Sequence, residues 1–250
     1  MPERGVLVKA CLNGGRRRAD HAATPVTPRE LAADARAAIA AGAAALHVHP
    51  RAGDERETLD PAACAAAVAA IRGDCPGIPV GLSTAAWIAS GPRARLAHIE
   101  AWTVLPEFAS VNFSEPGTAD VCAVLLRRGV GIEAGLWSME DARAFIASGL
   151  AGRCLRVLVE TQPADPEEAV AAAAAIDAAL DAAGIGLPRV HHGEGPATWA
   201  VLAAALDRGR DIRVGLEDTV TLPDGRRAPD NAALVAEAVR MVRRHGREPA

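Results

Sequence analysis

The chain has 250 residues, of which 50% are hydrophobic, and a formal net charge of −4. This length allows one sizeable core, and a charge this close to neutral gives no reason to expect a nucleic acid or an anionic membrane as a partner. The five cysteines are odd in number and contain no CxxC pair, which favours reduced thiols over a disulfide framework. No apolar run reaches the roughly 18 residues of a membrane span, and the N-terminal run is short for a signal peptide, so we expect a cytoplasmic protein.

Short runs of Val, Ile and Leu alternate with longer alanine-rich segments along the chain. Runs of this kind are typical of strands that are buried on both faces. In chain order they predict strands at 6–13, 45–50, 79–84, 108–113, 129–134, 155–160, 189–192 and 211–217.

The longer segments carry helix start signals. Thr27 as N-cap and Pro28 at the first helical position predict a helix over 27–42, which ends at a glycine. Similar signals predict helices over 60–73, 165–184 and about 230–244. Alternating strands and helices imply parallel βαβ units, and about eight such units predict a single-domain (β/α)8 TIM barrel over residues 1–250. An open doubly wound sheet is less favoured, because no strand is followed by a GxGxxG turn.

The active site of a (β/α)8 barrel lies at the C-terminal ends of its strands. Strand ends are polar in any protein because loops begin there, but that does not explain why histidines and carboxylates recur at these ends. The polar residues at the predicted ends are Asn13, His47, His49, Ser83, Thr84, Asn112, Ser114, Glu133, His191, His192, Glu217 and Asp218.

Two histidines, His47 and His49, stand one residue apart in the run LHVHPR. Strand side chains alternate between two faces, so both rings point to the same side, about 7 Å apart at a rise of roughly 3.3 Å per residue. Facing the barrel interior, both can reach one metal ion. Facing the outer helices, they are ordinary core histidines. Their position on one strand face favours metal ligation.

Glu217, in the run VGLEDT, is the candidate for a third ligand. The second and eighth strands of a barrel both neighbour the first, so their C-terminal ends can converge. Three protein ligands and one open position are typical of catalytic zinc. Asp218 follows at once and is expected to point differently, free to act as a base. The alternative for both carboxylates is helix capping or solvation in a loop.

Arg213 and Lys9 are candidates for charges inside the barrel. Arg213 stands four positions before Glu217 on the predicted strand, so both side chains point to the same face. A buried arginine needs a carboxylate partner from the protein or a substrate. A buried Lys9 with a depressed pKa could form a Schiff base, but its position in mid-strand favours a structural role. The triplet RRR at 16–18 is either a solvated loop or a contact for an anionic substrate or cofactor phosphates.

The motifs LHVHPR, GLSTA, ASVNF and IRVGLEDT, on the second, third, fourth and eighth strands, resemble those of the β-keto acid cleavage enzyme family. The resemblance covers nearly the whole chain and implies a TIM barrel. It implies that a catalytic Zn²⁺, or another divalent cation, is bound by His47, His49 and Glu217. The residues that it implies for holding and activating the substrate are Ser83, Arg213 and Asp218, with Asn112 and Ser114 lining the pocket.

The reaction that this resemblance implies is a condensation followed by a retro-Claisen cleavage. A β-keto acid and acetyl-CoA as co-substrate would give acetoacetate and a new acyl-CoA. A divalent ion stabilises the charge that builds on carbonyl oxygens in such a reaction. Asp218 would deprotonate the carbon between ketone and carboxylate, while Arg213 would hold or tune Asp218 and Ser83 would hydrogen-bond the carboxylate.

Two regions depart from the family's pattern. In the first loop, the region where the family has an acid that binds an amino group reads NGGRRR and has none, so we expect a neutral or anionic substrate side chain. The seventh strand carries His191, His192 and Glu194 where small or apolar residues are usual. His192 or Glu194 is expected to line the substrate pocket, and the alternative is that His192 competes as a metal ligand. Arg51 is expected to contact an anionic substrate or CoA at the rim.

We therefore expect a homo-oligomeric enzyme whose partners are small molecules. Three other interpretations stay open: a metal-dependent hydrolase or lyase on the same barrel, a Schiff-base aldolase using Lys9, and a non-catalytic barrel with a structural zinc. Many barrel hydrolases carry HxH on the first strand rather than the second, and a closed structural zinc site needs four protein ligands. The expected substrate-binding residues are Asn13, Thr84, Asn112, Ser114, Glu133, His192, Glu194 and Arg51.

Overall fold

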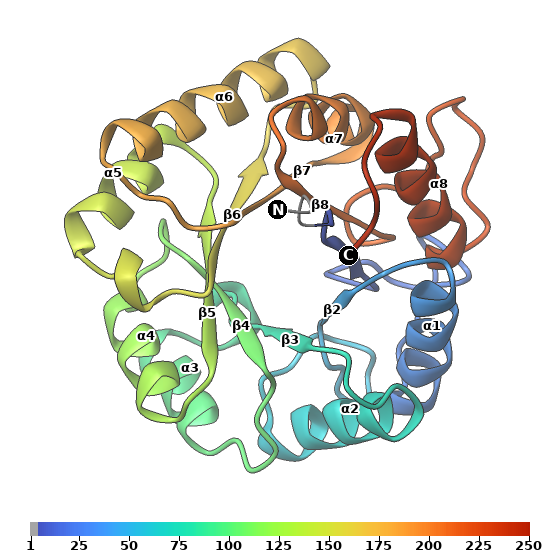
Figure 1. The fold of residues 1–250 in the computed structure, drawn as a ribbon. Helices are drawn as coiled ribbons and strands as arrows, with labels where there is room; N and C mark the ends of the chain where they lie inside the picture. The colour runs from blue at the N-terminus through green and yellow to red at the C-terminus, as the bar shows by residue number, and fades with distance from the viewer. Residues whose placement is uncertain (1–4) are drawn as a thin grey trace.

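The computed structural model describes residues 5–250, so residues 1–4 of the expected domain lie outside the described part of the chain. Eight parallel strands close into a barrel in chain order, with the last strand paired to the first. Helices alternate with the strands and form a ring outside them (Figure 1). The prediction of a (β/α)8 TIM barrel is confirmed.

The strands of the barrel are short, and every one that the sequence predicts is present. They are β1 (Val8–Cys11), β2 (Ala45–Val48), β3 (Val80–Ser83), β4 (Phe108–Asn112), β5 (Gly131–Leu136), β6 (Arg156–Thr161), β7 (Arg189–Gly193) and β8 (Asp211–Val214). The helices of the ring are α1 (Pro28–Ala40), α2 (Pro61–Asp74), α3 (Pro92–Glu100), α4 (Thr118–Arg127), α5 (Met139–Ser148), α6 (Pro166–Ala182), α7 (Thr198–Asp207) and α8 (Asn231–Arg244). Single 3-10 turns lie at Ala86–Ile88, Ala151–Arg153 and Gly195–Ala197.

The helix starts follow the capping signals in the sequence. Thr27 and Glu30 form a capping box at the start of α1. The carboxylates of Asp60 and Asp165 accept backbone N–H bonds at the starts of α2 and α6, and a proline follows each of them. These side chains satisfy N–H groups that have no partner within the helix, which explains why the predicted boundaries agree closely with the structure.

The eighth strand is shorter than the sequence predicts. It ends at Val214, and the N–H groups of Asp218 and Thr219 both donate to the carbonyl of Gly215, at 2.9 and 3.0 Å. Glu217 and Asp218 therefore lie in a turn at the barrel mouth rather than on the strand. The carboxylates of both residues contact Nη2 of Arg213, so they diverge less than their adjacent positions suggested.

The layer between strands and helices is apolar. Outward-facing side chains such as Val8, Leu46 and Leu82 are fully buried against the helices. Within residues 5–250, no helix is both long and apolar enough to cross a membrane.

Buried charges lie inside the barrel at mid-strand. Glu133 on β5 forms ion pairs with Lys9 on β1 and, at 2.6 Å, with Nε of Arg156 on β6. Burial alone would raise the pKa of Glu133, but the two cations outweigh it and hold the pKa well below its ordinary value. Because its ammonium group is engaged by Glu133, Lys9 has the partner expected of a structural lysine. Glu133 in turn faces two protein cations, which favours a structural role over substrate contact.

Replacing Glu133 by glutamine is expected to lower the free energy of unfolding by about 3–5 kcal/mol, because Lys9 and Arg156 are left buried without a counter-charge. Urea unfolding at neutral pH measures the change. The control is Glu100→Gln, which removes an exposed partner of Arg127 and should cost less than about 1 kcal/mol. Equal losses in the two variants would mean that the buried cluster contributes no more than a surface pair.

Candidate metal centre and active site

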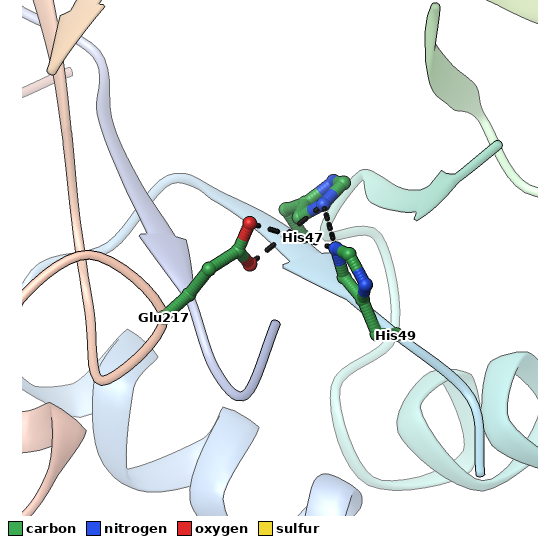
Figure 2. A group of neighbouring side chains, drawn as sticks. All are labelled: His47, His49 and Glu217. Carbon is green, nitrogen blue, oxygen red and sulfur yellow. Dashed lines mark hydrogen bonds and ion pairs between the residues drawn. The ribbon is translucent and has the colours of Figure 1, made fainter. Parts of the chain in front are cut away.

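Three side chains converge at the barrel mouth. Nε2 of His47, at the end of β2, lies 3.0 Å from Nε2 of His49, which directly follows that strand. The carboxylate of Glu217 faces both rings, with oxygens 3.8 Å from His47 Nε2 and 3.5 Å from His49 Nε2 (Figure 2). The ligand atoms of all three lie within 4.8 Å of one another. The two histidine rings therefore lie on the same side of the strand, as the alternation of strand side chains predicted, and Glu217 lies next to both.

The barrel closure and one glycine position Glu217. β2 and β8 both pair with β1, which places the turn after β8 opposite the end of β2. Gly14, just after β1, has φ +51°, and a Cβ there would overlap the side chain of Glu217. Only glycine combines that backbone with so close an approach. Asn231 fixes the turn from α8, because its side chain accepts the N–H of Leu216 at 2.7 Å and donates to the carbonyl of Leu12 at 2.8 Å.

Two further side chains hold His49. Its Nδ1 donates to Glu57, a residue of the loop after β2, at 2.5 Å. Asn13 accepts the N–H of His49 at 2.9 Å and donates to its carbonyl at 2.8 Å. A carboxylate on the far nitrogen of a ligating histidine fixes the ring and strengthens it as a ligand. Asn13, predicted to contact substrate, has its amide committed to the backbone around His49.

The electrostatics of the cluster fit a divalent cation. Burial holds the pKa of His47 well below its ordinary value, which keeps it a neutral ligand. Burial would also lower the pKa of His49, but the carboxylates of Glu217 and Glu57 outweigh it and raise that pKa to about 9. Burial alone would raise the pKa of Glu217, but Arg213 and the two histidines hold it well below its ordinary value. A metal ion would displace the proton on His49, so metal affinity should fall as the pH falls.

The donor set also suits such an ion. Two imidazole nitrogens and one carboxylate oxygen are typical zinc ligands, and a count of three leaves one coordination position open. Oε2 of Glu217 is buried and has no hydrogen-bond partner among residues 5–250. Among the described residues, the group that can share one ion comprises His47, His49 and Glu217 without His192.

Arg213 links the metal cluster to Asp218. Its Nη2 forms an ion pair with Glu217 and donates to Oδ1 of Asp218 at 2.7 Å, while its Nε lies 3.1 Å from the same oxygen. Both Arg213 and Asp218 are almost fully buried. The predicted partnership of the inward arginine with a carboxylate is present, and it leaves Asp218 oriented beside the candidate metal ligands.

The other polar strand-end residues divide between the pocket and the scaffold. Ser83 is buried at the end of β3, where its hydroxyl accepts the N–H of Ala85 at 3.2 Å and keeps its own proton available. Thr84 donates to the carbonyl of Ser110 at 2.6 Å. Asn112 donates to Glu115 at 2.9 Å. Thr84 and Asn112 therefore support the strand ends.

The remaining candidates lie at the rim. Ser114 and Glu194 are exposed. Ser114 borders a hollow of about 490 Å3 next to Trp137. Arg51 donates to the carbonyl of Arg16 at 3.0 Å and borders a cavity of about 410 Å3 that Glu57 also lines.

The arginines of the first loop have separate environments. Arg16 donates to the carbonyl of Leu216 and so helps to hold the turn that carries Glu217. Arg18 pairs with Glu30 at 2.8 Å. Arg17 lines the cavity beside Arg51. Of this triplet, Arg17 is therefore the arginine placed to meet a ligand.

Sequence reasoning missed two carboxylates of the site. Glu57 lies in a loop that folds back, so that the backbones of Glu57 and Arg51 form an isolated antiparallel β-bridge. No strand pattern in the sequence predicts that fold. Glu160 lies near the C-terminal end of β6, where its carboxylate contacts His192 at 3.0 Å. The rule that strand ends carry functional groups would have found Glu160, because its run LRVLVETQ has the same form as the others.

Comparison with known proteins agrees with the motifs and the fold. The model of the family described as beta-keto acid cleavage enzyme matches residues 5–250. The chain is 26% identical over 265 residues to a 3-keto-5-aminohexanoate cleavage enzyme of Fusobacterium nucleatum, covering 97% of this chain and 93% of that protein. It is 27% identical over 253 residues to a 3-oxoadipate:acetyl-CoA acetyltransferase of Cupriavidus necator, covering 92% of this chain and 86% of that protein.

Solved structures show the same architecture. The structure of ObcA in binary complex with oxaloacetate superposes with a TM-score of 0.76 at 19% identity, covering 91% of this chain. The chain spans 65% of the length of ObcA, and at this identity the likeness concerns the fold. Together with the family match over nearly the whole chain, the motifs and the barrel establish that this protein belongs to the β-keto acid cleavage enzyme family.

Proposed function

We propose that the protein is a zinc-dependent β-keto acid cleavage enzyme that uses acetyl-CoA as co-substrate. The observation that carries the proposal is the Asp218–Arg213 pair placed directly beside a three-residue group at the barrel mouth that can hold a metal ion. The use of acetyl-CoA is supported by the name of the relative from Cupriavidus necator. Zinc is supported by the nitrogen and oxygen donors and by the open fourth position.

The residues of the site suggest a division of labour. A bound divalent ion would supply Lewis-acid stabilisation for the oxygens of the keto acid. Asp218 takes the proton from C2 of the substrate, and the electron pair forms the enolate that attacks the acetyl carbonyl and expels CoA thiolate. The thiolate then attacks the original ketone carbon, the bond from that carbon to C2 breaks, and C2 takes the proton back as acetoacetate leaves. Arg213 holds Asp218, and the hydroxyl of Ser83 is placed to bind a carboxylate.

The substrate side chain is proposed to be neutral or anionic. The NGGRRR segment of the first loop supplies arginines and no acid, and Arg17 and Arg51 line the cavity of about 410 Å3 beside Glu57. The acidic neighbours Asp54 and Glu55 are paired with arginines at the surface. The remaining carboxylate among the described residues that line this cavity is Glu57, and it is bonded to His49.

The alternatives receive less support from the geometry. A Schiff-base aldolase needs a free amine, whereas Lys9 is paired with Glu133. A closed structural zinc site needs four ligands, whereas three converge within the described residues. A metal-dependent hydrolase on the same barrel would use the same residues, and the substrate assay separates it from the proposal. We also expect the enzyme to assemble as a homo-oligomer and to act in the cytoplasm.

An assay across a panel of 3-oxo acids, coupled to metal analysis of the purified protein, tests the proposed function. We expect at least one acid with a neutral or anionic side chain to yield acetoacetate and a new acyl-CoA in equal amounts, only when acetyl-CoA is present. Turnover without acetyl-CoA, or release of free acetate, by the zinc-loaded enzyme would favour the hydrolase instead.

A further inference from the structure

Glu160 is a buried carboxylate to which the proposed reaction gives no role. Its Oε1 accepts the indole N–H of Trp137 at 3.0 Å. Gly135 on β5 lies against this carboxylate, and a Cβ at that position would lie 2.5 Å from the same oxygen and 2.6 Å from Oδ1 of Asn112. The carboxylate therefore occupies space that the glycine leaves open and is fixed there by an aromatic donor.

His192 lies between Glu160 and Asp218. Glu160 and His192 are paired in the register of β6 and β7, so their side chains stand next to each other in the barrel mouth. Nε2 of His192 lies 3.0 Å from Oε2 of Glu160, and Nδ1 lies 3.4 Å from Oδ1 of Asp218. Nδ1 is also 3.4 Å from the carbonyl of Gly193. Arg213 also faces Glu160 and His192, and its Nη1 is 3.5 Å from Oε2 of Glu160.

The two oxygens of Asp218 are engaged unequally. Oδ1 receives Nη2 and Nε of Arg213 and is the oxygen that His192 faces. Within residues 5–250, the hydrogen-bond donor to Oδ2 is Nε of Arg213, at 3.3 Å. The surroundings therefore occupy Oδ1 and leave Oδ2 as the oxygen open to a substrate.

We propose that Glu160 and His192 are positioning residues for Asp218. Glu160 fixes the ring of His192, and His192 together with Arg213 engages Oδ1, so that Oδ2 is presented to C2 of the substrate. The inference rests on the proposed function, since it assigns Asp218 the role of base. A carboxylate that orients an imidazole is a recurrent way to hold a reactive group, and loss of such support usually costs about 10–100-fold in activity.

Two substitutions of His192 separate positioning from packing. The amide of His192→Asn comes close to the place of Nδ1 and can still contact Asp218. The amide of His192→Gln comes close to the place of Nε2 and can contact only Glu160. We expect His192→Gln and His192→Ala to lower kcat by about 10–100-fold, with KM and zinc content unchanged. We expect His192→Asn to keep a kcat close to that of the wild type.

Substitutions around Glu160 test the other half of the pair. Glu160→Gln removes the charge, and Gly135→Ala pushes a methyl group against the carboxylate, so both should lower kcat in the same direction as His192→Gln. The matched control is His191→Asn. His191 is the adjacent histidine of β7, but it faces α6 and lies 3.4 Å from Asp177. This control should leave kcat at the wild-type value.

Two kinetic outcomes would overturn the inference. Equal losses in His192→Asn and His192→Gln would mean that the Asp218-facing nitrogen has no special role. A raised KM at unchanged kcat would mean that His192 binds substrate directly, as the sequence predicted.

A measurement without substrate keeps this inference separate from the proposed function. In protein labelled with 15N-histidine, we expect Glu160→Gln to shift the Nε2 resonance of His192 and Asp218→Asn to shift its Nδ1 resonance. His192 resonances that do not move in either variant would overturn the pairing, even if no β-keto acid of the panel were turned over. A wild-type enzyme without acetyl-CoA-dependent turnover, but with both shifts present, would overturn the proposed function and leave the pairing intact.

Discussion

Replacing Asp218 by asparagine is expected to lower kcat by about 10²–10⁴-fold, the usual contribution of a positioned general base. Asparagine keeps the shape of the side chain but cannot accept the C2 proton. The variant should fold and bind metal, because Arg213 keeps ion pairs with Glu217 and Glu160. Steady-state kinetics at saturating substrate and metal analysis of the same preparation measure the two quantities.

The control for this substitution is Asp230→Asn. Asp230 caps α8 by accepting the N–H of Ala233 at 2.8 Å, and asparagine is an equally good cap. Its kcat should match that of the wild type. An Asp218→Asn enzyme that also turns over at the wild-type rate would remove Asp218 from the role of base.

Replacing His47 by alanine is expected to abolish metal binding. The loss of the metal is in turn expected to lower activity by about 10³-fold or more. Two ligands, His49 and Glu217, would remain, whereas catalytic zinc sites use three. The Lewis-acid contribution of such an ion is worth several kcal/mol, and each 1.36 kcal/mol corresponds to about a factor of ten in rate. Metal analysis after gel filtration and a titration of the metal-free protein with Zn²⁺ report the loss directly.

The matched control for His47→Ala is His98→Ala. His98 lies on α3, does not belong to the group of His47, His49 and Glu217, and is only partly buried. The control should keep both metal and activity. A His47→Ala protein that still purifies with stoichiometric zinc would show that the ion sits somewhere other than the cluster in Figure 2.

The barrel and the convergence of His47, His49 and Glu217 were predictable from the sequence because both follow from periodicity. Alternation along a strand determines which side chains face inward, so the pattern of the run LHVHPR is enough to pair His47 with His49. Closure of eight strands makes β2 and β8 neighbours of β1, which brings Glu217 within reach. The inward direction of the histidines and the proximity of β2 to β8 depend on the number of strands and on the alternation of side chains along each strand. A single sequence shows both.

The partner of each inward side chain was harder to predict. Parity says that Asn13 and Glu133 face inward, but not at which depth or against which group. In the structure Asn13 binds the backbone of His49, and Glu133 neutralises Lys9 and Arg156. These pairings depend on the stagger between strands, which the pattern of one strand does not contain.

Loop geometry was beyond the sequence for a different reason. Glu57 reaches His49 because the segment after β2 folds back on itself and forms an antiparallel β-bridge between Arg51 and Glu57. The sequence pattern extends the last strand to Glu217, yet Glu217 and Asp218 lie in a turn formed by backbone hydrogen bonds to Gly215. Turn hydrogen bonds and loop closure follow from tertiary packing, which local patterns do not record.

In the proposed reaction, the acetyl group of acetyl-CoA becomes part of the product acetoacetate. The most direct test supplies acetyl-CoA labelled with 13C at the acetyl carbonyl together with an unlabelled β-keto acid and the zinc-loaded enzyme. We expect the label to appear at the ketone carbon of acetoacetate, while the new acyl-CoA carries none. Label recovered as acetate, or acetoacetate formed without label, would contradict the proposed reaction.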